Sequence, residues 1–413
     1  MLNKGGENMM AKKRSLIYVI ILCLLMYLMY GIYFTVIGAD SNIMMGFFGI
    51  TESEQGFIMT IQSIGCLIMV ILLGLFGERI NKLHGLLAGL IIWGAAGILI
   101  GSMTLYTQQG TGYGLMLTFA LIGGVGYIMI DLLMNGVIAD IYPEKKEKVL
   151  PYVHAFYGLG AMLAPMLVTA LTDENEVKTF ALPYLILGIA VIVIALFFAI
   201  ASHKAMPATP YADMSEIKKR AVSNPAEVFK EGKAWLYLAS CFAYLLFQNG
   251  LVVWAPSYFK TVNNMTEAAG NNMLTIYFLG CLIIRLLSPL VYKFISVRKF
   301  YITATLLSAF SFGAVLLVQP LILKYIFIFI TGLLQGSAVP GMVVMCCNAF
   351  PKRTASASSI VVFGVSASSL IAPPLIGAVI EAAGYSIPMW GMTACLVISV
   401  LILLRSGKGS DNA

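Results

Sequence analysis

The chain has 413 residues, of which 60% are hydrophobic and only 11% are charged, with 26 Lys and Arg against 19 Asp and Glu. Soluble domains carry about 25% charged residues, so a chain with a mean hydropathy of +0.90 lacks the polar groups for a water-facing surface. This composition excludes a soluble enzyme, a nucleic-acid-binding protein and a disordered protein. The net charge of +7 is therefore interpreted from its placement along the chain.

Twelve long apolar stretches follow one another along the chain. Each is close to the roughly 20 residues that an α-helix needs to cross the hydrocarbon core, and none shows the alternating pattern of a membrane barrel strand. The first is too long for a signal peptide and lacks a small-residue cleavage site, so we expect it to be retained. The predicted spans are 15–47, 55–77, 84–105, 113–140, 150–171, 181–201, 233–259, 269–295, 298–318, 321–348, 354–380 and 384–404.

The basic residues predict the orientation of these spans. If the N-terminus is cytoplasmic and the chain crosses twelve times, nearly all of the 26 Lys and Arg residues fall on the cytoplasmic side. This asymmetry is typical of multi-pass membrane proteins. We therefore expect a plasma-membrane protein with both termini in the cytoplasm. The basic residues outside this pattern are Lys178, Lys260 and Lys324 on the external side and Arg285 within a helix.

The longest polar stretch, residues 202–232, contains three prolines and a basic cluster, which is typical of a cytoplasmic linker. It separates an N-terminal bundle, residues 1–201, from a C-terminal bundle, residues 233–413. We predict an all-α integral membrane protein with twelve transmembrane helices in two pseudo-symmetric six-helix bundles. Such repeats are typical of transporters with a substrate site between their halves. At one constant offset, Gly124 corresponds to Gly332, Pro143 to Pro351 and Ala164-Pro165 to Ala372-Pro373.

The loop after the second span has a recognisable pattern. Residues 74–82 read Gly-Leu-Phe-Gly-Glu-Arg-Ile-Asn-Lys, which resembles the Gly-x-x-x-Asp-Arg-x-Gly-Arg signature of the major facilitator superfamily. Glu replaces Asp, and Asn and Lys replace Gly and Arg. The resemblance implies a cytoplasmic gate in which Gly74 allows close helix approach and Glu78 and Arg79 form ion pairs. The alternative is a plain cluster of charges that sets the topology.

Four ionisable residues lie within or close to the predicted spans, namely Asp40, Asp131, His154 and Arg285. Because an ionisable group inside a membrane is costly, it marks a substrate pathway or a proton relay by default. For Asp131 the alternative is a paired structural carboxyl, and Asp40 has the alternative of an outer-loop position. For His154 the alternative is packing, and for Arg285 it is snorkelling toward the cytoplasm.

The surroundings of these residues resemble the fucose-permease-like sugar:proton symporters. Asp131, Asn135 and Pro143 have the spacing of that family's fourth helix, and Asp40 resembles its first-helix acidic residue. The resemblance implies that Asp40 and Asp131 couple protonation to sugar binding. One departure is that no asparagine precedes Asp40, where the stretch reads Phe-Thr-Val-Ile-Gly-Ala.

The same resemblance, together with the polar and aromatic residues of the spans, suggests a set of substrate contacts. A sugar needs several hydrogen-bonding groups and an aromatic surface, and these residue types provide both. The polar candidates come from spans four, five, seven and eight, and the aromatic ones from spans one, five and seven. The candidates are Tyr30, Asn135, His154, Tyr157, Gln248, Asn249, Trp254 and Arg285.

The sequence therefore predicts a secondary transporter that works by alternating access and takes up a sugar or similar small polar solute together with protons. The alternatives are a proton-driven exporter of amphipathic compounds and a transporter-like receptor without transport. An enzyme is not expected, because no catalytic or metal-binding constellation is present, and no cofactor or metal is expected either. The expected partners are a small-molecule substrate, protons and the lipid bilayer, with no nucleic acid, and we expect a monomer.

Overall fold

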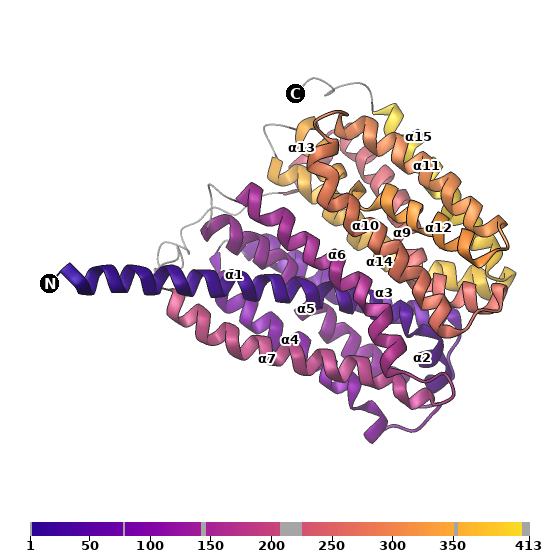
Figure 1. The fold of residues 1–413 in the computed structure, drawn as a ribbon, viewed down its shortest axis with the longest axis horizontal. Coiled ribbons are helices and arrows are strands. Elements are labelled where there is room, and N and C mark those ends of the chain that lie inside the picture. Colours follow the sequence, from indigo (N-terminus) through magenta and orange to yellow (C-terminus); the bar gives the residue numbers. More distant parts are fainter. Residues whose placement is uncertain (1, 77–78, 142–145, 207–224, 351–353, 407–413) are drawn as a thin grey trace.

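The computed structural model describes residues 2–76, 79–141, 146–206, 225–350 and 354–406, and these residues are overwhelmingly helical (Figure 1). Twelve helical segments in this part of the chain are long and apolar enough to cross a membrane, as predicted. They are Ile17–Ala39, Glu52–Leu73, Lys82–Gly101, Tyr113–Ile138, Val153–Leu171, Val177–Ala205, Gly232–Asn263, Glu267–Val291, Val297–Leu317, Leu321–Ala349, Ser359–Ala383 and Ser386–Arg405.

The first half of the chain forms α1 (Leu2–Ala39), α2 (Ser41–Phe48), α3 (Glu52–Phe76), α4 (Lys82–Gly101), α5 (Tyr113–Ile141), α6 (Lys146–Leu171) and α7 (Ala181–Ala205), with short 3-10 turns η2 (Met103–Leu105) and η3 (Val177–Phe180). The second half forms η5 (Pro225–Lys230), α9 (Gly232–Asn263), α10 (Glu267–Val291), α11 (Val297–Leu317), α12 (Leu321–Gln335), α13 (Ala338–Ala349), α14 (Thr354–Ala383) and α15 (Ser386–Arg405).

Two predicted spans, each expected to be one continuous helix, are divided in the structure. The first ends at Ala39, and the short helix α2 follows and stops at Gly49, which has a left-handed φ of 67°. The tenth is divided into α12 and α13 at Gly336 and Ser337. Pro340 lies four residues after Gly336 and has no N–H to donate to the Gly336 carbonyl, so the series of helical hydrogen bonds is interrupted there.

The helices form two groups that lie side by side (Figure 1). In the first, α1 packs on α6 and α7, and α4 packs on α5 and α7; in the second, α9 packs on α14 and α15, and α10 and α11 pack on α12. The groups meet mainly through α3 with α14 and α6 with α10, and also through α1 with α9. We call them the first and second bundle. Of the predicted linker 202–232, residues 207–224 lie outside the described residues.

Glycine allows the bundles to approach one another at backbone distance. A Cβ on Gly38 of α1 would lie 2.0 Å from the carbonyl oxygen of Val252 in α9. This oxygen has no helical N–H donor, because the residue four positions later is Pro256. A Cβ on Gly56 of α3 would lie 2.5 Å from the carbonyl of Pro373 in α14. Small residues at such crossings are the usual means of close packing between membrane helices.

Candidate functional site

A carboxyl group lies in the interior of the first bundle, in the last third of the chain's fourth span. Asp131 of α5 is half-buried, and its Oδ1 accepts a short hydrogen bond from the hydroxyl of Tyr27 in α1. Asn135, one turn later on the same helix, donates from Nδ2 to the Asp131 carbonyl oxygen at 2.8 Å and to the Tyr27 hydroxyl oxygen at 3.1 Å. These partners are neutral, so they orient the carboxyl group without neutralising a charge on it.

Aromatic rings surround this carboxyl group. The ring of His154 in α6 meets the ring of Tyr27 edge-on at 5.1 Å, and the His154 side chain is exposed. Tyr30 stacks on Tyr127 with ring centroids 3.8 Å apart, and it also lies 5.8 Å from Tyr157. The structure thus brings together Asp131, Asn135, His154, Tyr30 and Tyr157 of the predicted set.

Arg285 of α10 reaches this region from the second bundle. Its guanidinium carbon lies 5.3 Å from the centre of the Tyr157 ring, a cation–π geometry across the two bundles. Its Nε donates to the carbonyl oxygen of Gly336 at 2.7 Å. This is the carbonyl that Pro340 leaves without a helical donor, so the break between α12 and α13 creates the acceptor that holds Arg285 in place.

The other predicted residues of the second bundle have different surroundings. Trp254 is fully buried, and its indole N–H donates to the carbonyl of Pro373 at 3.2 Å. Asn249 is buried and donates to the hydroxyls of Ser368 at 2.9 Å and Ser369 at 3.1 Å, which links α9 to α14. Gln248 is 7% exposed. The structure does not bring Trp254 and Asn249 into the group around Asp131.

Asp40 lies apart from Asp131, at the junction of α1 and α2. It is fully buried, and neither carboxyl oxygen has a hydrogen-bond donor within the described part of the chain. Burial raises the pKa of Asp40 well above the ordinary carboxyl value, and the nearby charge of Glu267 raises it further. A neutral carboxylic acid is therefore the favoured form at this position.

Hydrogen bonds and ion pairs join the two bundles at the end of the molecule near α2, which we call the distal end. Asn42 of α2 donates to the carboxyl oxygens of Glu267 in α10 at 2.9 and 3.0 Å and accepts from Ser257 of α9 at 2.7 Å. Lys260 of α9 forms ion pairs with Glu267 at 2.9 Å and with Glu174 of the first bundle at 3.0 Å. We call these five residues the distal latch.

Two further bonds join α3 to the second bundle at the distal end. The backbone N–H of Ser53 donates to Glu381 at 2.5 Å, and the hydroxyl of Tyr385 donates to Glu52 at 3.2 Å. With the latch, they join the two bundles at this end.

The predicted gate residues are only partly described. Gly74 lies within α3, Arg79 is exposed, and Glu78 lies outside the described residues. Nearby, Lys82 is buried and forms an ion pair with Asp140 at 3.0 Å, which joins the start of α4 to the end of α5. This pair was not predicted.

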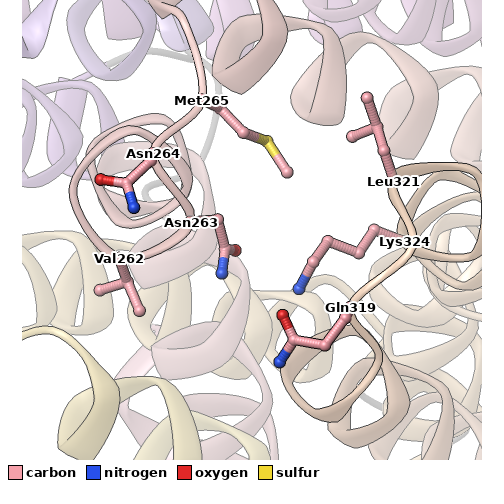
Figure 2. A pocket seen from close by; sticks show the side chains of 7 residues that line it. All are labelled: Val262, Asn263, Asn264, Met265, Gln319, Leu321 and Lys324. Atoms are coloured by element: carbon pink, nitrogen blue, oxygen red, sulfur yellow. The ribbon is translucent and has the colours of Figure 1, made fainter.

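A pocket of about 320 Å³ lies at the distal end of the second bundle. Figure 2 shows Lys324, Asn263 and Gln319 pointing toward one another across it. Lys324 is buried, and its ammonium donates to the carbonyl of Val315 at 3.0 Å, near the C-terminus of α11. A cation at a helix C-terminus is stabilised by the helix dipole, and none of the predicted site residues lines this pocket.

Sequence reasoning missed Tyr27 as a partner of Asp131. A signal was available, because Tyr27, Tyr30 and Phe34 recur at helical spacing on one face of the first span. It also missed the distal latch, whose residues are far apart in the chain. Within the described residues, no group of three or more His, Cys, Asp or Glu side chains is arranged to hold a metal ion.

Three solved structures share this architecture at low sequence identity. The D-xylose–proton symporter has a TM-score of 0.75 at 16% identity, covering 96% of this chain and 99% of the other. A bacterial homologue of the human lysosomal transporter Spinster, in an inward-facing and occupied conformation, has a TM-score of 0.74 at 16% identity, covering 95% and 97%. The nucleoside transporter NupG has a TM-score of 0.73 at 13% identity, covering 95% and 99%. These likenesses establish the fold.

Two curated proteins are related in sequence. The uncharacterised MFS-type transporter YfkL of Bacillus subtilis is 24% identical over 276 residues, which cover 66% of this chain and 68% of YfkL. Bypass of stop codon protein 6 of Saccharomyces cerevisiae is 22% identical, covering 95% of this chain and 83% of that protein. The model of the Major Facilitator Superfamily matches residues 19–271 and 261–412, which is nearly the whole chain. The chain therefore belongs to the major facilitator superfamily of transporters.

Proposed function

We propose that this transporter couples proton movement through Asp131 to the uptake of a small polar solute, such as a sugar. The observation that carries the proposal is the setting of Asp131, a half-buried carboxyl inside a membrane span with neutral hydrogen-bond donors around it. An ionised carboxylate is costly in such surroundings unless it is paired or protonated. Protonation therefore changes the free energy of moving this site through an occluded state, which is the requirement for coupling.

The solute would bind between the bundles, next to Asp131. His154 and Asn135 offer hydrogen bonds, Tyr30 and Tyr157 offer aromatic surface, and Arg285 faces them from the second bundle. A few polar groups set among aromatic rings are typical of small-molecule sites. Gln248 is a further candidate from α9. Asn249 and Trp254 contribute by holding α9 against α14, since their polar groups already have partners.

The distal closure supports a role in alternating access. With the termini in the cytoplasm, as the basic residues predict, the distal end faces the outside and this state receives solute from or releases it to the cytoplasm. Opening toward the outside then requires the distal latch to break. In that state Gly74, Glu78 and Arg79 would form the cytoplasmic gate, and buried Asp40 would meet external water when the latch opens. We further propose that the protein acts as a monomer in the plasma membrane.

Proteoliposomes with an inward-directed proton gradient test the coupling. A panel of sugars and organic acids is screened for accumulation against a concentration gradient by the wild-type protein. Asp131→Asn should abolish accumulation but retain counterflow, because the fixed neutral amide cannot exchange a proton. Asp173→Asn, in the exposed distal loop, is the matched control and should behave as the wild type.

Accumulation that persists in Asp131→Asn would overturn the assignment. Efflux of amphipathic compounds without uptake would favour the exporter alternative, and the aromatic lining of Tyr30, Tyr127 and Tyr157 is the observation in its favour. Absence of counterflow with every solute in the panel would favour a receptor without transport.

A further inference from the structure

The guanidinium of Arg285 forms no ion pair within the described part of the chain. Its Nε is engaged by the Gly336 carbonyl and its face lies over the Tyr157 ring, but no described carboxylate lies within ion-pair distance. The side chain is half-exposed. A guanidinium has five N–H donors in a fixed fork, so most of them remain for another partner.

The hydrogen bond to the Gly336 carbonyl does not explain why residue 285 is charged. That carbonyl needs one neutral donor, which a glutamine would supply without placing a cation inside the membrane. A charge within a membrane span is retained at a cost and marks a functional contact. The planar fork of arginine matches a carboxylate with two parallel hydrogen bonds, which points to an anionic partner.

The charges of Asp131 and Arg285 together define which combinations of protonation and bound solute allow the carrier to pass through its occluded conformation. With Asp131 ionised and no solute, the two charges sum to zero and the empty carrier can reorient. With Asp131 protonated and no solute, the site carries one uncompensated positive charge. A solute with a single negative charge restores neutrality only when Asp131 is protonated. The same solute beside an ionised Asp131 leaves one negative charge, so neither component moves alone.

We propose that the transported solute carries one negative charge, as a carboxylate does, and that Arg285 binds that group. The proposal rests on the proposed function, in which Asp131 takes the coupled proton. A neutral sugar would leave Arg285 uncompensated in the loaded state, whereas a sugar acid or another small organic acid would not. A phosphate monoester carries between about one and a half and two negative charges at neutral pH, so it would over-compensate the site.

Other titratable groups around Asp131 do not change this sum while they stay neutral. These groups are the imidazole of His154, several phenols and a thiol. They come from four helices of the first bundle, namely Tyr27 and Tyr30 of α1, Cys66 of α3, Tyr127 of α5, and His154 and Tyr157 of α6.

Matched pairs of solutes test the proposal on the purified full-length protein and in proteoliposomes. The pairs are D-glucuronate with D-glucose and lactate with lactamide, and glucose 6-phosphate serves as the over-charged probe. At least one monoanion should raise the melting temperature and be taken up, while its neutral partner and the phosphate ester should do neither. Arg285→Gln should weaken binding of that monoanion by roughly 10-fold or more, and Arg285→Lys should retain the preference for the anion at lower affinity.

A ligand-free measurement tests the charge balance on which the proposal depends, even if no probe binds. Fluorophores on exposed Thr111 and Gln319, one on each bundle at the distal end, report the exchange between conformations. At pH 8, Asp131→Asn should exchange roughly 10-fold or more slowly than the wild type, because its site has a net positive charge. The double variant Asp131→Asn/Arg285→Gln is neutral again and should exchange freely. Equal rates in the single and double variants would overturn the charge-balance rule.

The outcomes separate this inference from the proposed function. Proton-driven uptake of a neutral solute that is unaffected by Arg285→Gln would leave the coupling intact and overturn the anionic substrate. Uptake of a monoanion that depends on Arg285 but is unaffected by the proton gradient and by Asp131→Asn would support the anionic substrate and overturn the proton coupling.

Discussion

The two bundles use polar side chains inside their spans in opposite ways. In the second bundle Gln335 accepts from the Tyr277 hydroxyl at 3.1 Å and donates to Ser308 at 2.9 Å, and all three residues are buried. In the first bundle Asp131 is half-buried and its partner Tyr27 contacts the ring of exposed His154. The first of these networks is fully buried, whereas the second includes half-buried and exposed side chains and lies near Arg285 of the other bundle.

This difference shows how two repeats of one architecture can take separate roles. Buried polar groups need internal partners, so a saturated network makes a stiff scaffold with little capacity for chemistry. The second bundle presents Arg285 from such a scaffold, with the Gly336 carbonyl fixing its position. The first bundle keeps its carboxyl group accessible, which is what proton exchange requires.

The largest expected effect comes from breaking the fully buried network with Gln335→Leu. This change leaves the Tyr277 hydroxyl without its acceptor and Ser308 without its donor, and each buried unsatisfied group costs about 1–3 kcal/mol. We expect the free energy of unfolding to fall by about 2–4 kcal/mol in detergent titrations. Transport per folded molecule should be unchanged, and exposed Gln319→Leu is the control. A selective loss of coupling with full stability would contradict the comparison.

The distal latch, to which both bundles contribute, should respond next. Glu267→Gln removes the charge that Lys260 contacts at 2.9 Å, and we expect the closed distal end to be weakened by about 1–3 kcal/mol. A cysteine at buried Ser257 should then react faster with an impermeant thiol reagent added from outside. Glu381→Gln, at an exposed contact, should have a smaller effect. No change in labelling would show that the latch does not hold the closed state.

Asp40 offers a test by pH. Because burial raises its pKa, the folded state binds the proton of Asp40 more tightly than the unfolded state does. The resulting contribution to the free energy of unfolding is fully present below the ordinary carboxyl pKa. It is lost as pH rises through the raised pKa. The melting temperature of the wild type should therefore fall between pH 5 and pH 8 relative to Asp40→Asn, which cannot ionise there. Parallel melting curves for the two proteins across this range would refute the prediction.

The smallest effects come from a matched pair of tyrosines. Tyr27→Phe removes the hydroxyl that donates to Asp131, and Tyr244→Phe removes one that donates to the Gln335 carbonyl at 3.0 Å. Either loss should cost about 1 kcal/mol of stability at most. Only Tyr27→Phe should also alter the pH profile of uptake, because its partner Asp131 is the proposed proton-coupling residue. An altered profile in Tyr244→Phe alone would reverse the roles of the bundles.

Some of the site was predictable because its signals are local. Asp131 and Asn135 lie one helical turn apart, and an intramembrane carboxyl is a strong marker in a chain with few charges. The role of Arg285 was harder to judge, since its holding acceptor arises from Pro340 in a different helix. Trp254 looked like an aromatic surface for a solute, but burial and the Pro373 carbonyl give it a packing contact that no spacing within α9 reveals.

The sequence by itself determined the membrane environment, the twelve spans, the expected orientation and the superfamily, because hydrophobic length and charge placement are read residue by residue. Only the tertiary structure decided that Asp40 is fully buried with no hydrogen-bond partner for its carboxyl group among the described residues while Asp131 is half-buried, and that Arg285 faces the first bundle without an ion-pair partner in the described part of the chain. These properties depend on helices distant in the chain, since desolvation and ion pairing are set by whatever packs against a group rather than by its neighbours in sequence.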